Sequence, residues 1–275
     1  MVPAPGRGPG NWVGAPSALP DGADGWVIAY RVRTPATRGG SVVVATSPDG
    51  EQLSTVATLS QDRFGAESLE RPALVRLPDG GWRLYVSCAT PGTKHWRIDA
   101  LDAAEPAALG DAEAHTVFPG DEHLGVKDPV IRPTADGWQA WICCHPLDVP
   151  GAEDRMHTRF AISSDGLSWS WRGLALSGRP GFWDARGARV TAVLPDGRAA
   201  YDGRATAEEN FSERTGLAVP SRGAELLAAQ GDAPVADVRY LDVVPLDDGG
   251  YRLYYEAPLA DGSHELRTAV VPPRS

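Results

Sequence analysis

Short runs of alternating apolar and polar residues, separated by Asp-Gly turns, recur along the whole chain. The two clearest copies are ERPALVRLPDGGWRLYVSCA, residues 70–89, and KDPVIRPTADGWQAWICCH, residues 127–145. In each copy an apolar strand runs into an Asp-Gly turn and then into a second strand with alternating aromatic and apolar positions, which is typical of a β-hairpin. The repeat therefore predicts an all-β fold built from hairpins.

Three further copies occupy residues 17–33, 188–204 and 241–258. The five turns begin at Asp24, Asp79, Asp136, Asp196 and Asp248, at intervals of 55, 57, 60 and 52 residues. This even spacing suits four-stranded antiparallel units and disfavours a β-sandwich, the alternative all-β fold. We therefore predict a single domain over residues 1–275, a five-bladed β-propeller. The expected blades are approximately 12–62, 67–120, 125–180, 186–235 and 238–272.

The later part of each repeat is less regular. Residues 42–50 and 160–169 each read as a third strand that runs into another Asp-Gly turn, and residues 264–271 fill the same place in the last repeat. The chain then ends, so the last blade either stays short or is completed by the N-terminal segment. Residues 105–115 and 224–230 could each form a brief helix.

Charge and composition limit the binding partners and the cellular location that the sequence favours. The formal charge of −10 and the pI near 5.1 disfavour nucleic acid, which needs a basic surface. No apolar run has the length of a signal peptide core or a membrane span, so we expect a cytoplasmic protein without a membrane partner. Three cysteines, Cys88, Cys143 and Cys144, cannot all pair within one chain, and we expect reduced, buried thiols.

The repeat carries a family resemblance that covers nearly the whole chain at the level of architecture. The succession of strand, Asp-Gly hairpin, aromatic strand and a SSDGLSW turn at residues 163–169 resembles the five-bladed propeller glycosidases. These are the arabinanase and xylosidase group of family 43, the invertase and levansucrase group, and the mannoside phosphorylases. The resemblance implies three carboxylates on the innermost strands of different blades, acting as general base, pKa modulator and general acid. The KDPV motif of residues 127–130 is similar to the modulator motif and implies that role for Asp128.

The rest of the implied triad diverges. The first blade has NWVG at residues 11–14 where an aspartate is expected, and Arg189-Val190 stands where a glutamate motif is expected. Because cleavage of a glycosidic bond needs two carboxyl groups that face one cavity, we searched the strand starts for acidic residues. The candidate catalytic residues are Glu70, Asp128, Asp184 and Asp242.

Candidate substrate-binding residues lie beside them. The segment FWDARGAR, residues 182–189, combines aromatic rings with guanidinium groups, which suits sugar stacking and the clamping of hydroxyl or carboxylate groups. The substrate-binding candidates are Arg71, His145, Trp183, Arg186, Arg189, Tyr240 and Glu256. Four of the catalytic and substrate-binding candidates have a structural alternative: an ion pair between blades for Glu70 and Arg71, a turn for Asp128, and a blade contact for Asp242.

These observations lead to a functional expectation. We expect a glycoside-hydrolase-like enzyme that acts on a small soluble saccharide or glycoside at the mouth of the central channel, without a cofactor. A calcium ion in the channel stays an open alternative. The second hypothesis is a propeller of another class in the same cavity, either a small-ligand-binding protein or a lyase or cyclase. A mouth lined mainly by arginine and aromatic residues would favour anion binding without glycoside cleavage.

Overall fold

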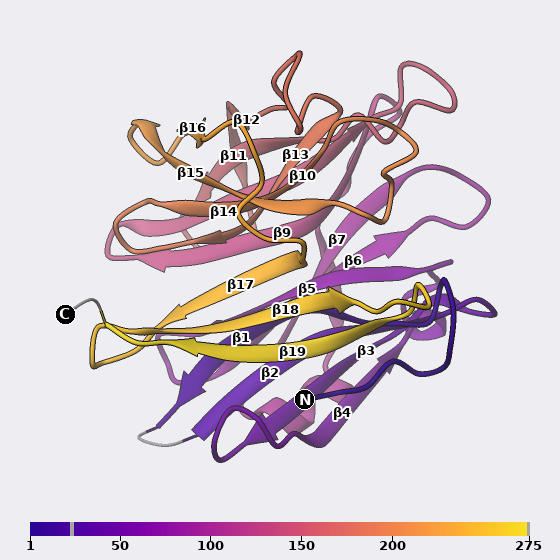
Figure 1. Cartoon of the computed structure of the whole chain (residues 1–275). Helices are drawn as coiled ribbons and strands as arrows, with labels where there is room; N and C mark the ends of the chain where they lie inside the picture. Colours follow the sequence, from indigo (N-terminus) through magenta and orange to yellow (C-terminus); the bar gives the residue numbers. More distant parts are fainter. Residues whose placement is uncertain (23–24, 274–275) are drawn as a thin grey trace.

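The fold is all-β, as predicted. The computed structural model describes residues 1–22 and 25–273, and in them the only helices are two short 3₁₀ turns, η1 (Gln61–Phe64) and η2 (Pro106–Gly110). The strands form one seven-stranded sheet and three four-stranded sheets. Figure 1 shows the chain passing through the sheets in turn and returning with its last strands beside its first.

The strands fall into five consecutive groups, which we call repeats one to five. Repeat one comprises β1 (Trp12–Asp21), β2 (Gly25–Thr34), β3 (Arg38–Ser47) and β4 (Ser54–Ser60). Repeat two comprises β5 (Leu69–Arg76), β6 (Trp82–Ala89), β7 (Trp96–Ala103) and β8 (Ala114–Phe118). Repeat three comprises β9 (Leu124–Thr134), β10 (Gly137–Pro146), β11 (His157–Ser163) and β12 (Ser170–Leu176). Repeat four comprises β13 (Gly187–Val193), β14 (Ala199–Arg204), β15 (Arg214–Arg222) and β16 (Leu226–Gln230). Repeat five comprises β17 (Arg239–Pro245), β18 (Tyr251–Pro258) and β19 (His264–Val271).

The predicted hairpin turns hold their shape through the aspartate side chains. The turns at Asp79, Asp196 and Asp248 join the first two strands of their repeats, and each carboxylate accepts a hydrogen bond from the backbone N–H two residues later, at 2.8–3.0 Å. The glycine that follows each aspartate has a φ of 84–89°, which only glycine adopts readily. The turn at Asp136 also joins β9 to β10, whereas Asp24 lies outside the described residues.

The ends of the chain meet in the seven-stranded sheet. β19 pairs in parallel with β1 through His264 and Trp12, and Val2 forms an antiparallel bridge with Leu266. The N-terminal segment therefore lies along the outer edge of repeat five, one of the two alternatives expected for the incomplete last repeat. Since repeats one and five share a sheet, the count of five blades stays a prediction. The expected helix at 224–230 is wrong, because residues 226–230 pair with β15 as strand β16.

A β-bulge interrupts the first strand of every repeat at nearly the same place. The register slips between Gly14 and Ser17, and equivalent slips occur in β5, in the β9–β10 pair, in β13 and in β17. The bulge begins at Ala15, Arg71, Asp128 and Tyr240 in repeats one, two, three and five, and three of these residues have a positive φ of 51–52°. In repeat four the register slips one residue later, at Thr191. Because a bulge bends a strand and re-aims a side chain, the repeated bulge gives each repeat one residue directed differently from its neighbours.

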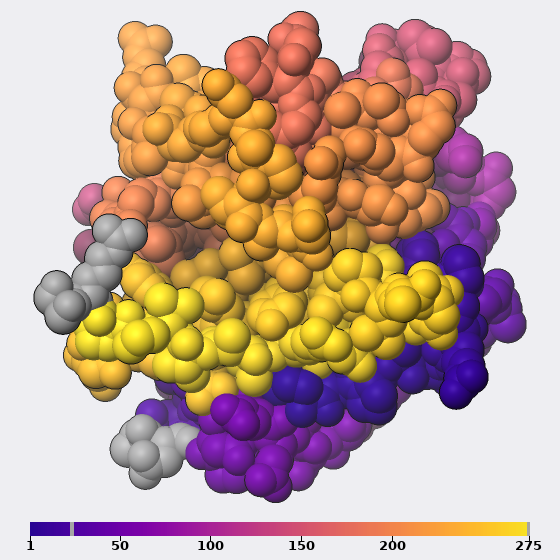
Figure 2. Space-filling model, viewed as in Figure 1, coloured from indigo at the N-terminus to yellow at the C-terminus, as the bar shows by residue number. Residues whose placement is uncertain are grey.

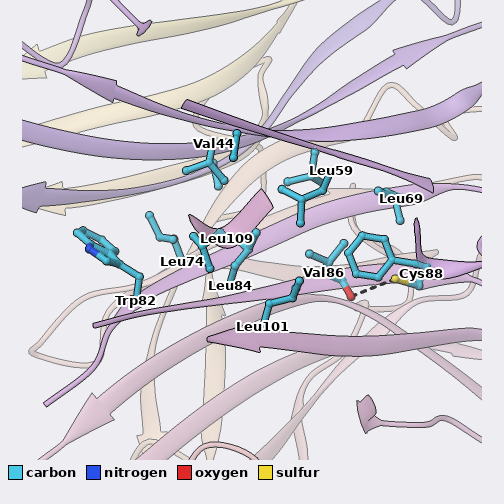
Figure 3. Close-up of a cluster of buried hydrophobic side chains, with 14 of the residues drawn as sticks. Val44, Leu59, Leu69, Leu74, Trp82, Leu84, Val86, Cys88, Leu101 and Leu109 are labelled. Atoms are coloured by element: carbon cyan, nitrogen blue, oxygen red, sulfur yellow. Dashed lines mark hydrogen bonds between the residues drawn. The ribbon is translucent and has the colours of Figure 1, made fainter. Parts of the chain in front are cut away.

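The hydrophobic core consists of four clusters, each between two repeats. They join repeats one and two, two and three, three and four, and five and one. Figure 3 shows the first, in which Leu109 from η2 lies among Val44 of repeat one and Leu74, Trp82 and Leu84 of repeat two. Trp82, Trp138 and Trp141 pack in these clusters, and the three cysteines are free and buried.

Candidate functional site

The candidate site is a buried ring of charged residues just before the bulges. In each repeat a residue just before the bulge on the first strand, directly before it in repeats one, two, three and five and two residues before it in repeat four, pairs with a residue near the end of the second strand. These pairs are Gly14 with Arg31, Glu70 with Ser87, Lys127 with Cys143, Arg189 with Asp202, and Arg239 with Glu256. Because equivalent strand positions recur around the sheets, residues far apart in sequence meet at one level of the fold.

Two chains of ion pairs connect this ring. In the first, Arg31 joins Glu70 at 3.1 Å to Glu256 at 2.5 Å. Arg239 then joins Glu256 at 2.8 Å to Glu213 at 2.7 Å, and Glu213 also pairs with Arg204. In the second chain, Arg189 joins Asp128 at 3.0 Å to Asp202 at 2.6 Å, and Lys127 lies 3.6 Å from Asp128. Each buried carboxylate named here therefore has at least one cationic partner.

The phenol of Tyr240 lies between the two chains. The guanidinium carbons of Arg189, Arg239 and Arg31 lie 3.8, 5.2 and 5.9 Å from the centre of its ring, as in cation–π contacts. Its hydroxyl accepts a hydrogen bond from Arg189 at 2.9 Å, and its backbone N–H donates to the carboxylate of Asp202. The bulge at Tyr240 thus places an aromatic ring against three of the arginines.

A cavity of about 30 Å³ lies at this level of the channel. It is lined by Arg31, Glu70, Lys127, His145, Met156, Arg189, Arg204, Asn210, Phe211, Glu213, Arg239 and Tyr240. Five of these side chains carry a positive charge, whereas only Glu70 and Glu213 carry a carboxyl group. Since one water molecule takes up about 30 Å³ of liquid volume, the cavity as it stands holds about one water.

The surroundings set the ionisation of the acidic groups. Burial opposes ionisation of Glu213, but the charges of Arg239, Arg189 and Arg204 outweigh it and lower the pKa of Glu213 to about 2. Burial likewise opposes ionisation of Asp128, and Lys127 and Arg189 lower the pKa of Asp128 to about 2. Asp202 differs, because burial outweighs the effect of Arg189 and raises its pKa. Glu213 is therefore an ionised carboxylate on the cavity wall.

His145 contributes a neutral imidazole to the same wall. Burial and the nearby charge of Lys127 lower the pKa of His145 to about 3. Its Nδ1 lies 2.8 Å from the carbonyl oxygen of Glu153, so Nδ1 carries the proton, and its Nε2 lies 3.5 Å from the Cys143 sulfur. The imidazole is thus fixed in one tautomer by a backbone acceptor.

A loop between β14 and β15 covers the cavity. Phe211 in this loop has a φ of 75°, and its ring lies 5.0 Å from the Trp12 ring and 5.5 Å from the guanidinium carbon of Arg33. The same loop brings Asn210, which accepts a hydrogen bond from Arg204 at 2.9 Å, and Glu213 to the cavity. Three residues of this loop therefore form part of the cavity wall.

The structure brings six of the predicted site residues together here. Glu70, His145, Arg189 and Tyr240 line the cavity. Asp128 and Glu256 are fully buried behind it and bind lining arginines, Asp128 through Arg189 and Glu256 through Arg31 and Arg239.

Two other predicted residues lie toward the opposite end of the channel. Arg71 and Asp242 line a separate cavity of about 280 Å³, formed by residues that follow the bulges in all five first strands. The Arg71 guanidinium donates to the carbonyls of Pro16, Pro129 and Thr191 at 2.7–3.2 Å and lies 3.8 Å from Asp242. Burial raises the pKa of Asp242. Arg71 thus ties three first strands together across the axis.

The remaining three predicted residues lie away from both cavities. Asp184 accepts hydrogen bonds from Arg179 at 2.9 Å and from the Tyr201 hydroxyl at 2.8 Å. Trp183 packs in the cluster between repeats three and four, stacked on Tyr201. Arg186 pairs with Asp154 at 2.6 Å. The structure therefore does not bring the FWDARG part of the 182–189 segment to the candidate site.

Sequence reasoning did not select several residues of the site. Sequence reasoning missed three arginines, Arg31, Arg204 and Arg239. In a strand with alternating apolar and polar residues, an arginine resembles an ordinary surface charge. Glu213 and Phe211 were missed because they belong to a loop rather than to the repeat. The strand register also bears on the catalytic aspartate that the resemblance implies for the first repeat. The bulge position equivalent to Asp128 is Ala15 in that repeat, so it carries no carboxylate there.

Among the described residues, no group of three or more histidine, cysteine, aspartate or glutamate side chains is arranged to hold a metal ion. No helix within residues 1–22 and 25–273 has the length and apolar character needed to span a membrane.

Comparison with known proteins places this fold. No protein-family model matches the chain, and no curated protein sequence matches it. Among solved structures, a thermostable family-43 glycoside hydrolase superimposes with a TM-score of 0.70 at 14% identity, covering 96% of this chain and 95% of that one. An α-L-arabinofuranosidase from Lactobacillus brevis superimposes with a TM-score of 0.66 at 14% identity, covering 94% of this chain and 89% of that one. A β-1,2-mannobiose phosphorylase from Listeria innocua superimposes with a TM-score of 0.68 at 13% identity, covering 98% of this chain and 90% of that one. The chain therefore has the β-propeller fold that these glycoside hydrolases and phosphorylases share.

Proposed function

We propose that the protein is a glycoside-hydrolase-like enzyme that acts on a small saccharide at the covered cavity of the channel. The observation that carries this proposal is the presence of two carboxylates from different parts of the chain, Glu70 and Glu213, on the wall of one axial cavity. Hydrolysis of a glycosidic bond needs such a pair, one to protonate the leaving oxygen and one to activate water or to attack.

Both carboxylates form ion pairs with arginines, Glu70 with Arg31 and Arg33 and Glu213 with Arg204 and Arg239. The low pKa of Glu213 keeps it ionised, which suits a base that takes a proton from water or a nucleophile that attacks the anomeric carbon. Glu70 then donates a proton to the leaving oxygen. Asp128 holds Arg189 and Lys127 on the cavity wall, where their N–H groups can bind sugar hydroxyls. The ring of Tyr240 and the loop ring of Phe211 offer apolar faces for a sugar.

A second candidate function rests on the excess of positive charge. Five cationic side chains line the cavity against two carboxylates, which favours binding of an anionic small molecule without cleavage. In this case the carboxylates serve only to hold the arginines in place. The second candidate function also includes a lyase or cyclase that uses the same cavity, since one fold can carry out several unrelated reactions.

A turnover screen separates the two candidates. Purified protein is incubated with chromogenic arabinosides, xylosides, galactosides, mannosides and fructosides, each with and without inorganic phosphate. The proposal expects release of the chromophore from at least one neutral glycoside. Absence of turnover on every glycoside, together with binding of phosphate or a sugar acid in a calorimetric titration, would support the anion-binding candidate instead.

A further inference from the structure

The junction between repeats four and five differs from every other junction between repeats. The other four junctions each contain a hydrophobic cluster, but none of the clusters formed by residues 1–22 and 25–273 joins repeat four to repeat five. An open cavity of about 390 Å³ lies there instead, with walls that include Ala192, Ala200, Leu217, Leu241, Leu253 and Val271. Figure 2 looks onto this side of the molecule, where the orange atoms of repeat four meet the yellow atoms of repeat five and the surface between them is recessed.

The register of the repeats explains the cavity. Beyond the bulge, the first and second strands of each repeat resume their pairing. The second-strand residue at which pairing resumes is Tyr85 in repeat two, Trp141 in repeat three and Tyr254 in repeat five. Each of these aromatic side chains reaches the next repeat and donates a hydrogen bond to a backbone carbonyl there: Tyr85 to Gly166, Trp141 to Ala224, and Tyr254 to Gly50. An aromatic ring with a polar tip is therefore the usual filling of this position.

Repeats one and four have alanine at the same position, Ala29 and Ala200. At the junction that follows Ala29, a packed hydrophobic cluster contains both Ala29 and the fully buried Leu109 from η2, which Figure 3 shows among its neighbours. At the junction that follows Ala200, repeat five contributes three strands within residues 25–273, and these residues contain no turn after β19 that could receive an aromatic tip as in the other repeats. The space that a ring occupies in repeats two, three and five is thus left open.

The surfaces of the cavity are apolar, with hydrogen-bonding groups toward its edge. Leu217 is 46% exposed and Val271 is 42% exposed, so both present apolar surface at the opening of the cavity. Tyr251 accepts a hydrogen bond from Arg198 at 3.0 Å across the junction, and Arg198 is neutralised by Asp196 at 2.6 Å. A site of this composition suits a neutral molecule with an apolar body and one polar group.

We propose that this cavity binds a flat, neutral aromatic molecule of one or two rings with one hydrogen-bonding group. The equivalent positions of the fold hold a phenol or an indole from the chain itself, so the geometry points to a free molecule of the same chemistry. An apolar cavity of about 150 Å³ is known to accept benzene, and the larger volume here leaves room for a second ring. This site lies outside the charged cavity and does not depend on the function proposed for it.

Calorimetric titration with indole tests the site, and Ala200→Leu is the variant that fills it. Wild type should bind indole saturably at one site, and Ala200→Leu should weaken binding at least tenfold. Because the added side chain enters empty space, Ala200→Leu should also raise the melting temperature by about 2–4 °C. The matched control is Ala29→Leu, which adds the same atoms at the equivalent position of repeat one, where Ala29 is fully buried in a packed cluster; it should lower the melting temperature and leave indole binding unchanged.

Several outcomes would overturn the proposal. Failure of wild type to bind indole would do so, as would equal indole binding by Ala200→Leu. A fall in melting temperature for Ala200→Leu as large as that for Ala29→Leu would show that the junction is already packed. A concentration-dependent dimer in sedimentation that Leu217→Asp abolishes would show instead that a second copy of the chain covers the cavity.

Discussion

At the scale of single residues, burial and pairing decide what each charged group can do. The acidic and basic groups around the charged cavity are nearly all removed from water, and each acid lies against arginine or lysine. Leaving one such charge without its partner is strongly unfavourable in a buried site, whereas the pair itself adds little to stability. The network therefore fixes the positions of side chains in the cavity more than it stabilises the fold.

His145 supplies a prediction about pH. Its pKa is about 3 in the folded protein against 6.5 when unperturbed, so below pH 6.5 the unfolded chain takes up a proton that the folded chain does not. This contribution to stability is complete above pH 6.5 and is lost as the pH falls toward 3. At pH 5 the loss amounts to about 2 kcal/mol.

The prediction is checked by urea unfolding at pH 7 and pH 5. His145→Gln should lose less stability than wild type over this interval, while His115→Gln, which changes an exposed imidazole, should lose as much as wild type. Below pH 4.5 all variants should lose stability further, because the depressed pKa values of Glu213 and Asp128 make folding depend on their ionised forms. An equal loss between pH 7 and pH 5 in His145→Gln would contradict the assignment.

At the scale of elements, the repeated bulge organises both ends of the channel. Residues before the bulges form the charged ring, and residues after them form the wider cavity that contains Asp242. The side chain of one bulge residue, Arg71, donates to carbonyls of β1, β9 and β13. A single guanidinium group therefore connects these first strands to one another.

Arg71→Lys should therefore destabilise the fold. Lysine keeps the charge but cannot donate in three fixed directions, so it leaves buried carbonyls without a partner. We expect a loss of about 2–4 kcal/mol in the free energy of unfolding, measured by urea denaturation. Arg76→Lys, in the same strand but exposed, is the control and should change stability by less than about 0.5 kcal/mol. A neutral effect of Arg71→Lys would mean that water replaces the lost bonds.

The covering loop gives a second prediction at this scale. Ligand sites usually have volumes of about 300–1,000 Å³, far above the 30 Å³ found beneath Phe211, so entry of a saccharide requires the loop to open. Phe211→Ala removes the contacts with Trp12 and Arg33 and should speed substrate entry and product release. With any glycoside that the protein cleaves, we expect kcat to change by at least about threefold. Phe182→Ala, an exposed phenylalanine outside the site, should not change it; unchanged kcat in Phe211→Ala would show that the loop does not control turnover.

Elements were also what the sequence predicted best. Asp-Gly turns and alternating apolar residues determine hairpins locally, so the strands of residues 70–89 and 127–145 could be identified directly. The site could be predicted only in part. Glu70, Asp128 and Arg189 sit at positions that the repeat aligns, whereas Asp184 and Arg186 precede the bulge level and turn toward Arg179 and Asp154. Loop residues such as Glu213 have no counterpart in other repeats, and only the three-dimensional path of the loop brings them to the axis.

At the scale of the whole molecule, the arrangement separates three environments. The charged cavity lies at one level of the channel, the Arg71 and Asp242 cavity lies beyond the bulges, and the apolar cavity opens at the junction of repeats four and five. The likeness to propeller glycoside hydrolases and phosphorylases fixes the fold, and the proposed chemistry rests on the first of these environments. Its central claim is that Glu70 and Glu213 act together on a glycosidic bond.

The most direct test compares the hydrolysis rates of wild type, Glu70→Gln and Glu213→Gln on the best glycoside from the screen. Both variants keep the shape of the side chain and remove its acid–base function, so each should lower kcat by about 10²–10⁴. Glu208→Gln, an exposed residue of the same loop, should match wild type, and circular dichroism should confirm that all three variants are folded. Retention of wild-type kcat by folded Glu70→Gln or Glu213→Gln would contradict the account.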